Sequence, residues 1–146
     1  MNYRARALGM SKTRFANPHG LDHINNYSTC EDVYAMCTEA MKREIFRKIA
    51  KTASHKGFFK FFRDGKVVAK PILWTNTNKL LEKDHVIGIK TGNTARAGGC
   101  LATAFMVDSQ SEGFIVVLGS NSIEGRFKDT LKILNWLKEE SMTDTS

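Results

Sequence analysis

Apolar residues recur at helical spacing in the first third of the chain. Ser28 followed by Glu31 forms a capping-box signature, which predicts the start of a helix. The apolar positions of this helix lie three or four residues apart: Val33, Met36, Cys37, Ala40 and Met41. A bend near Arg43 separates it from a second helical stretch that contains Phe46 and Ile49. Two amphipathic helices are therefore predicted here.

The residues before these helices have a different pattern. Residues 2–8 are compatible with a short helix, and Gly9 stands where a helix C-cap is expected. Residues 10–27 are rich in polar and turn-forming side chains, so we expect a loop.

Strand patterns begin with a run of phenylalanine and basic residues over 58–63. Asp64-Gly65 follows as a hairpin turn, and 66–69 provides the return strand. Such rings are able to stack nucleic-acid bases, but aromatic residues on a hairpin more often pack one face against a neighbouring element. We therefore expect this hairpin to pack on the body of the domain.

Three further strand patterns follow in close succession in the second half of the chain. They occupy residues 86–94, 98–107 and 113–119, with short polar turns between them. Strands joined this closely pair antiparallel, which predicts a three-strand meander.

A final amphipathic stretch over 124–140 predicts a helix that covers this sheet. Its apolar face carries Phe127, Leu131, Leu134 and Leu137. Residues 141–146 are expected to fray. The predicted fold class is α+β, with N-terminal helical segments, an antiparallel meander and a C-terminal covering helix.

The composition fits one soluble domain. The chain has 146 residues, and Lys+Arg exceed Asp+Glu by 22 to 15, a net charge of +7. This charge favours anionic partners, but the basic residues are dispersed along the chain, so we predict no nucleic-acid partner. No apolar run is long enough to span a membrane, and the first residues lack the apolar core of a signal peptide.

Cysteine and histidine spacing predicts neither a metal site nor a disulfide framework. The three cysteines include no C-x-x-C pair, and we expect Cys30 and Cys37 to be small core residues of one helix. His19 and His23 are four residues apart, as two metal ligands on a helix would be. A proline and a glycine flank His19 and disfavour that helix. We predict no metal and no cofactor.

The first strand of the predicted meander carries the most distinctive chemistry. Strand alternation turns Ile87 and Ile89 toward a core. Gly88, Lys90 and Gly92 then face away and place an ammonium group beside bare backbone. Such backbone can accept an extended substrate as an added strand, while Lys90 and the hydroxyl of the following threonine suit a carboxylate or an oxyanion.

Several segments then share one pattern along nearly the whole chain. They are residues 13–22 (Thr-Arg-Phe-Ala-Asn-Pro-His-Gly-Leu-Asp), 76–81 (Asn-Thr-Asn-Lys-Leu-Leu), 88–94 (Gly-Ile-Lys-Thr-Gly-Asn-Thr), 97–101 (Ala-Gly-Gly-Cys-Leu) and 125–126 (Gly-Arg). In this order they resemble the C-terminal half of the serine-type D-alanyl-D-alanine carboxypeptidases, the low-molecular-weight penicillin-binding proteins. The resemblance implies a partial transpeptidase/β-lactamase-like domain.

The resemblance also implies roles for five residues. Lys90 would set the electrostatics around a nucleophilic serine, and Thr91 would bond the terminal carboxylate of the substrate. Gly92 would leave room for substrate along the strand edge. The backbone N–H of Asn93 would be one of two oxyanion-hole donors. Arg126 would lie beside the substrate carboxylate, and the alternative is a surface arginine at a helix start. The implied partner is a peptidoglycan peptide ending in D-Ala-D-Ala, or a β-lactam.

The family carries three motifs, S-x-x-K, S-x-N and K-T-G, of which this sequence has the third alone. We therefore expect residues 1–146 to be a single, N-terminally truncated domain that is inactive alone. A non-catalytic module that binds peptidoglycan peptides or another anionic ligand is the alternative. Truncation would leave a strand edge and a hydrophobic face open, which predicts self-association. The resemblance implies a location outside the cytoplasmic membrane.

Overall fold

The computed structural model describes residues 1–143 and has an α+β fold, as the sequence predicts. The elements in chain order are α1 (Asn2–Ala7), α2 (Cys30–Met41), α3 (Glu44–Lys51), β1 (Ser54–Arg63), β2 (Lys66–Thr75), the 3-10 helix η1 (Lys79–Glu82), β3 (Val86–Thr94), β4 (Gly98–Met106), β5 (Glu112–Ser120) and α4 (Gly125–Thr143). Of the tail predicted to fray, residues 141–143 belong to α4, and 144–146 lie outside the described residues.

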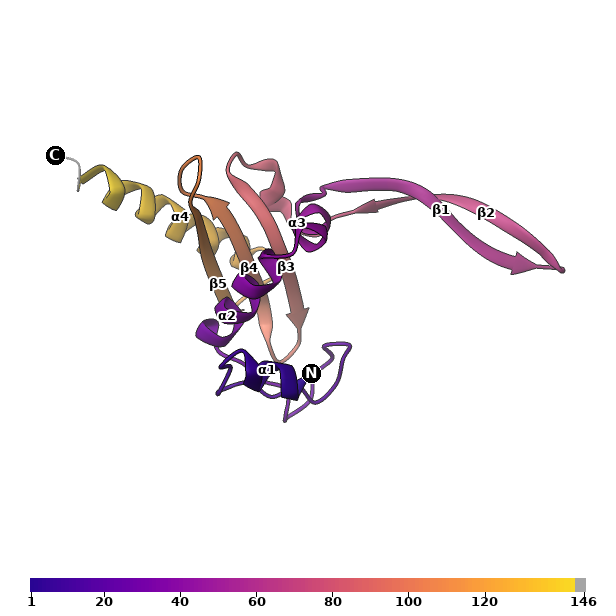
Figure 1. The fold of residues 1–146 in the computed structure, drawn as a ribbon, viewed down its shortest axis with the longest axis horizontal. Helices are drawn as coiled ribbons and strands as arrows, with labels where there is room; N and C mark the ends of the chain where they lie inside the picture. The colour runs from indigo at the N-terminus through magenta and orange to yellow at the C-terminus, as the bar shows by residue number, and fades with distance from the viewer. Residues whose placement is uncertain (144–146) are drawn as a thin grey trace.

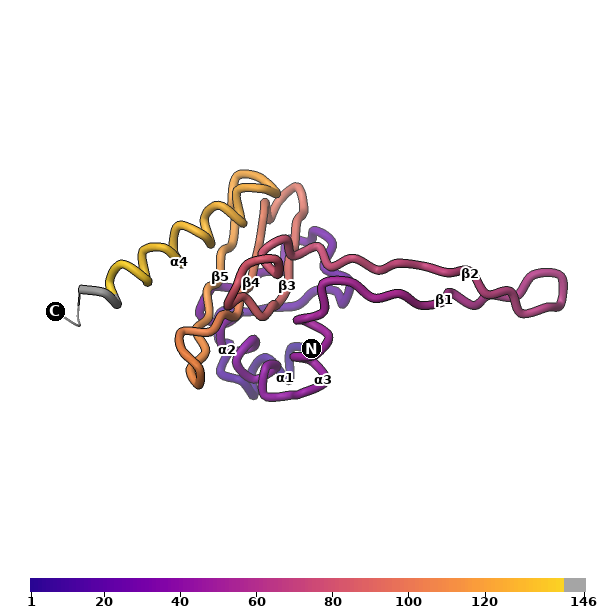
Figure 2. Tube along the Cα trace, turned by 90° about the horizontal axis from the view of Figure 1, so that it is seen from above, coloured from indigo at the N-terminus to yellow at the C-terminus, as the bar shows by residue number. Residues whose placement is uncertain are grey.

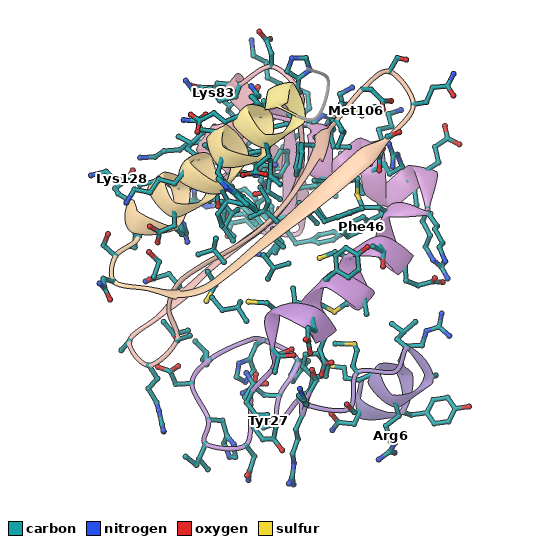
Figure 3. The ribbon with its side chains drawn as sticks, turned by 90° about the vertical axis from the view of Figure 1, so that its left-hand side faces the viewer. Arg6, Tyr27, Phe46, Lys83, Met106 and Lys128 are labelled. Atoms are coloured by element: carbon teal, nitrogen blue, oxygen red, sulfur yellow. The ribbon has the colours of Figure 1, made fainter. Side chains whose placement is uncertain are left out.

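Strands β3, β4 and β5 form the predicted antiparallel meander in that order. Helix α4 covers one face, and α2 and α3 cover the other (Figures 1 and 2). Figure 3 shows the same arrangement from the side, with side chains filling both layers. The prediction of an open hydrophobic face is therefore wrong, because helices of this chain cover both faces. The edge of β3 has no strand partner among the described residues, as expected.

Two apolar clusters lie on the two sides of the sheet. One joins the sheet to α4 and η1 through Leu80, Val86, Leu101, Phe105, Ile115, Phe127 and Leu134. The other joins it to α2 and α3 through Cys37, Met41, Ile87, Ile89, Ala102 and Ala104. Toward its C-terminal end α4 extends past the sheet, so Leu137 of the predicted apolar face is partly exposed (Figure 1).

Helix α2 begins one residue later than the capping box predicts. The Thr29 side chain accepts a hydrogen bond from the Asp32 backbone N–H, so Thr29 is the N-cap. The Ser28 hydroxyl is instead paired with the Thr13 hydroxyl at 2.7 Å. The Asp32 carboxylate accepts from Thr13 at 2.6 Å and fastens the loop of residues 10–27 to α2.

Two cysteines of α2 differ in burial. Cys37 is buried in the core, and this burial raises the pKa of its thiol to about 11. Cys30 is exposed at the first turn of the helix, so its prediction as a core residue is wrong.

An ion pair ties α3 to β5. The Arg47 guanidinium binds the Glu112 carboxylate through its two terminal nitrogens, Nη1 and Nη2, and the bond from Nη1 spans 2.9 Å. This contact lowers the pKa of the Glu112 carboxyl and raises the pKa of Arg47.

The hairpin of β1 and β2 is longer than predicted and does not pack on the domain. Its ten-residue strands pair from Ser54 opposite Thr75 to Arg63 opposite Lys66, closed by the predicted Asp64-Gly65 turn. The hairpin projects away from the body (Figure 1). Phe62 is 81% exposed, so the prediction that these rings pack on a neighbouring element is wrong.

Candidate functional site at the edge strand β3

Strand β3 is anchored at its first half and exposed at its second. Its first four residues are buried, and Ile87 and Ile89 lie in the core as predicted. Gly88 is buried too, so it is not the bare backbone that we expected. A side-chain carbon at Gly88 would lie 3.1 Å from the Ala50 Cβ of α3. The accessible part of the edge therefore begins at Lys90.

Lys90 and Thr91 point to opposite sides of the strand, as alternation requires. Lys90 is exposed, and its ammonium donates to the Thr91 carbonyl oxygen. The Thr91 side chain is buried, and its hydroxyl lies 2.6 Å from that of Thr77, in the turn between β2 and η1. That turn is fixed by Asn78, whose side chain accepts from the Leu80 N–H. A partly buried hydroxyl pair thus fixes the strand directly after Lys90.

Arg126 lies behind the glycine of this strand. Its Nη1 donates to the Gly92 carbonyl oxygen at 2.8 Å, and its guanidinium carbon lies 4.8 Å from the centre of the Phe127 ring. The side chain is 6% exposed, so a surface arginine at the helix start is excluded. Its Nε is buried and has no hydrogen-bond partner within residues 1–143.

The glycine of β4 allows this approach. A Cβ on Gly99 would lie 2.3 Å from the Ser122 carbonyl oxygen, in the turn before α4. Only a residue without a side chain lets this turn, and with it Arg126, come so close to the sheet.

A cavity of about 370 Å³ lies at the end of β3. Asn93 and Gly92 line it from the strand, and His23 and Tyr27 line it from the loop before α2. The predicted site residues Gly92 and Asn93 are therefore brought together with a loop about 70 positions earlier in the sequence.

Asp22 holds this loop on the sheet, and sequence reasoning gave it no role. Its carboxylate accepts from the Thr94 hydroxyl at 2.5 Å and from the Arg96 backbone N–H at 3.2 Å. Its place at the end of the shared 13–22 segment was the available signal. The contact itself joins positions 72 residues apart, which no local pattern reveals.

The histidines of this loop are engaged with the backbone. His19 Nδ1 accepts from the Leu21 N–H at 3.2 Å, and His23 Nδ1 accepts from the Asn25 N–H at 3.1 Å. Across residues 1–143, no group of three or more histidine, cysteine or acidic side chains has the placement of a metal site. The same residues include no helix that is long and apolar enough to cross a bilayer.

Chemically, the edge combines an accessible strand, an ammonium and a buried guanidinium. Both cations lie next to Gly92, one on the strand itself and one behind it. This arrangement suits an extended ligand with a negative charge.

Comparison with known proteins agrees with this geometry. Residues 1–122 match the family described as D-alanyl-D-alanine carboxypeptidase. A D-alanyl-D-alanine carboxypeptidase of Streptomyces sp. (strain K15) is 33% identical over 93% of this chain and 46% of its own length. The D-alanyl-D-alanine carboxypeptidase DacF of Bacillus subtilis is 32% identical over 93% of this chain and 33% of its own.

Solved structures share the fold. The Streptomyces K15 DD-transpeptidase, solved as an S216A mutant, superposes with a TM-score of 0.83 at 33% identity, covering 92% of this chain and 51% of that one. Penicillin-binding protein D2 of Listeria monocytogenes, solved with cefotaxime bound, gives 0.72 at 27% identity with the same coverage. The chain belongs to the D-alanyl-D-alanine carboxypeptidase family. It spans between a third and a half of the length of these curated relatives.

Proposed function

We propose that this chain supplies the substrate-holding strand of a serine-type D-Ala-D-Ala carboxypeptidase. The observation that carries the proposal is the edge of β3, where Lys90 and Gly92 are exposed and the buried Arg126 braces Gly92 from behind. The family match covers the strand and the loop that closes its cavity.

Each residue has a physical role in this proposal. The Gly92 edge receives the peptide as an added strand, and the Asn93 N–H donates to the oxyanion that forms at the scissile carbonyl. Lys90 attracts the terminal carboxylate. Thr91, whose buried side chain is bonded to the Thr77 hydroxyl, holds the strand in place. Arg126 adds positive charge from behind the strand and fixes the position of Gly92 through its carbonyl.

The reaction is acyl transfer. A serine hydroxyl attacks the carbonyl of the D-Ala-D-Ala peptide bond, the bond to the terminal D-alanine breaks, and water then hydrolyses the ester. No serine of this sequence has a lysine three positions later or an asparagine two positions later. The nucleophile therefore comes from residues other than these 146, and the 146 residues alone do not form an acyl-enzyme.

The coding sequence upstream of Met1 tests this proposal. It should encode S-x-x-K and S-x-N, and their absence would rule out an intact parent enzyme. The extended protein should release D-alanine from a peptide ending in D-Ala-D-Ala, and Lys90→Ala should lower kcat/KM on the order of 100-fold. An unchanged kcat/KM would remove Lys90 from the site.

A second candidate function is a non-catalytic module that binds peptidoglycan peptides. The observation that favours it is that Lys90, Thr91 and Arg126 hold their places within this chain without any contribution from a serine. Such a module would bind the peptide and release it unchanged, whereas the enzyme would release D-alanine.

From this proposed substrate class we infer a location outside the cytoplasmic membrane, where peptidoglycan is matured. We also propose that the 146-residue chain self-associates through the free edge of β3, since an unpaired edge is a template for another strand. Light scattering at micromolar concentration should give a mass above that of the monomer. A monodisperse monomer would refute this association.

A further inference from the structure

The β1–β2 hairpin is the most exposed apolar feature of the described structure. It projects from the body next to α3 (Figures 1 and 2). Residues paired across the two strands share a face, so the register assigns Phe58, Phe62, Val67 and Leu73 to one face. These four side chains are 56–81% exposed. Isolated exposed apolar residues are common, but a row of four on one hairpin face indicates an interaction surface. We call this row the Phe62 face.

Cations accompany these apolar side chains. Lys56 and Lys60 alternate with Phe58 and Phe62 on the same face, whereas Arg63 and Lys66 pair at the tip on the opposite face. The hairpin carries five lysine and arginine residues against one acid, Asp64. Its partner is therefore anionic as well as apolar.

The opposite face also exposes apolar side chains, with Phe59 57% and Trp74 46% exposed, but its rings are paired with one another. Phe59 and Phe61 stack on each other with ring centres 6.0 Å apart, and Trp74 stacks on His55 at the same separation. The Trp74 ring also occupies the space above Gly57, where a Cβ would lie 2.7 Å from it. These rings contact one another, whereas Phe58 and Phe62 stack on no other ring within residues 1–143.

The side chains of the hairpin favour an anionic lipid surface over nucleic acid and over a second copy of the hairpin. Apart from charged groups, the hydrogen-bonding side chains of the hairpin lie at its base: Ser54, His55, Trp74 and Thr75. Its outer part thus has none of the neutral polar groups that read base edges or sugar hydroxyls. Phe58 and Phe62 are four residues apart, about 13 Å along a strand, which is too far for stacking successive bases. A second copy of the hairpin would bring five further cations against these five.

We propose that the β1–β2 hairpin binds the surface of an anionic lipid bilayer through the Phe62 face. The apolar row enters the boundary between headgroups and acyl chains, as the apolar side of an interfacial amphipathic element does. Lys56 and Lys60 extend along the same face to lipid phosphates. Arg63 and Lys66, on the opposite face at the tip, add to the positive charge near the anionic surface. This docking keeps β3 near the membrane surface, and it does not rest on the proposed peptidase activity.

Vesicle co-sedimentation of the 146-residue chain tests the proposal. The chain should partition onto vesicles of phosphatidylcholine and phosphatidylglycerol, bind pure phosphatidylcholine much more weakly, and lose affinity as salt rises. Replacing Lys56 and Lys60 by glutamine should weaken binding about 30-fold, since each cation near an anionic surface contributes about 1 kcal/mol. Phe58→Ser with Phe62→Ser should weaken it on the order of 10-fold per ring.

Two matched controls separate this surface from general charge and stickiness. Lys128→Gln with Lys132→Gln removes two exposed cations from α4, and Ile45→Ser with Ile49→Ser removes two exposed apolar side chains from α3. Both controls should bind as the parent does, and circular dichroism should show the same fold for all variants.

Three binding results would overturn the proposal. The first is no binding to the anionic vesicles. The second is an equal loss of vesicle affinity in the hairpin variants and in the control variants. The third is that changes in the Phe62 face weaken binding to a single-stranded oligonucleotide but not binding to vesicles. In a further check, Phe62→Trp should shift its added emission to shorter wavelength when vesicles are present. An unshifted emission would show that the ring stays in water and would equally overturn it.

Discussion

Arg126 donates a hydrogen bond from Nη1 to the Gly92 carbonyl oxygen, 2.8 Å away, and so joins the first turn of α4 to the exposed end of β3. The bond places a buried positive charge directly behind the glycine on which the proposed substrate lies. It also gives that carbonyl a charged donor within the protein, so the position of the strand edge depends on α4.

Arg126→Met should lower the free energy of unfolding by about 1–2 kcal/mol, because the Gly92 carbonyl loses a charge-assisted bond. The variant also no longer buries a guanidinium whose Nε has no hydrogen-bond partner. This gain in stability offsets part of the loss. Urea unfolding measures it. Equal or greater stability of Arg126→Met would show that the burial cost of the charge exceeds the value of its bond.

Replacement by alanine should affect stability far more at Gly99 than at Gly92. Gly99→Ala places a methyl group against the Ser122 carbonyl, a backbone atom, and should cost about 2–3 kcal/mol in urea unfolding. At Gly92 the nearest atom is the Cys100 Cβ at 3.8 Å, an ordinary contact, so Gly92→Ala should change stability by less than about 1 kcal/mol. The same Gly92→Ala variant should bind peptide more weakly, because the methyl group occupies the strand edge. If it binds as tightly as the parent, the ligand does not lie along this edge.

The Arg47–Glu112 pair should make stability depend on pH. Because Arg47 lowers the pKa of Glu112 in the folded state, the pair stabilises the protein fully above the unfolded-state pKa of Glu112 and is lost as pH falls through the folded-state pKa. At neutral pH, Glu112→Gln should cost about 1 kcal/mol, since both side chains are partly exposed.

The difference in the free energy of unfolding between the parent and Glu112→Gln should disappear at acidic pH. Glu31→Gln is the matched control, because Glu31 pairs with Lys12 at 3.6 Å with both side chains largely exposed. It should show little effect at any pH. A Glu112→Gln difference that persists below the folded-state pKa would assign the effect to packing.

The meander was predictable because its signals are local. Strand β3 has the predicted bounds, and the Asp64-Gly65 turn lies where predicted. Both follow from the local sequence, because strand alternation and turn type depend on adjacent residues. The helix start was missed by one residue because Ser28 finds a partner in Thr13, a contact that the capping pattern does not contain.

The rest depends on contacts between distant segments. The Phe-rich sequence of β1 is compatible with a strand that packs on the body of the domain and with one that extends away from it. The direction in which the chain leaves α3 determines that the hairpin extends away. The sequence pattern alone indicated Lys90, Thr91 and Gly92 as candidate site residues. The Arg126 bond to Gly92 and the Asp22 bond to Thr94 join segments 34 and 72 residues apart, so their geometry required the fold.

Calorimetric titration of the 146-residue chain with a peptide ending in D-Ala-D-Ala tests the central claim most directly. The matched ligand is the same peptide with its terminal carboxylate amidated, and the matched variant is Lys90→Ala. Binding heat should appear with the free carboxylate and be lost both with the amide and in Lys90→Ala, because the cations beside Gly92 recognise the carboxylate. Equal heats for acid and amide, or no binding by the parent chain, would contradict the assignment of β3 as the substrate-holding strand.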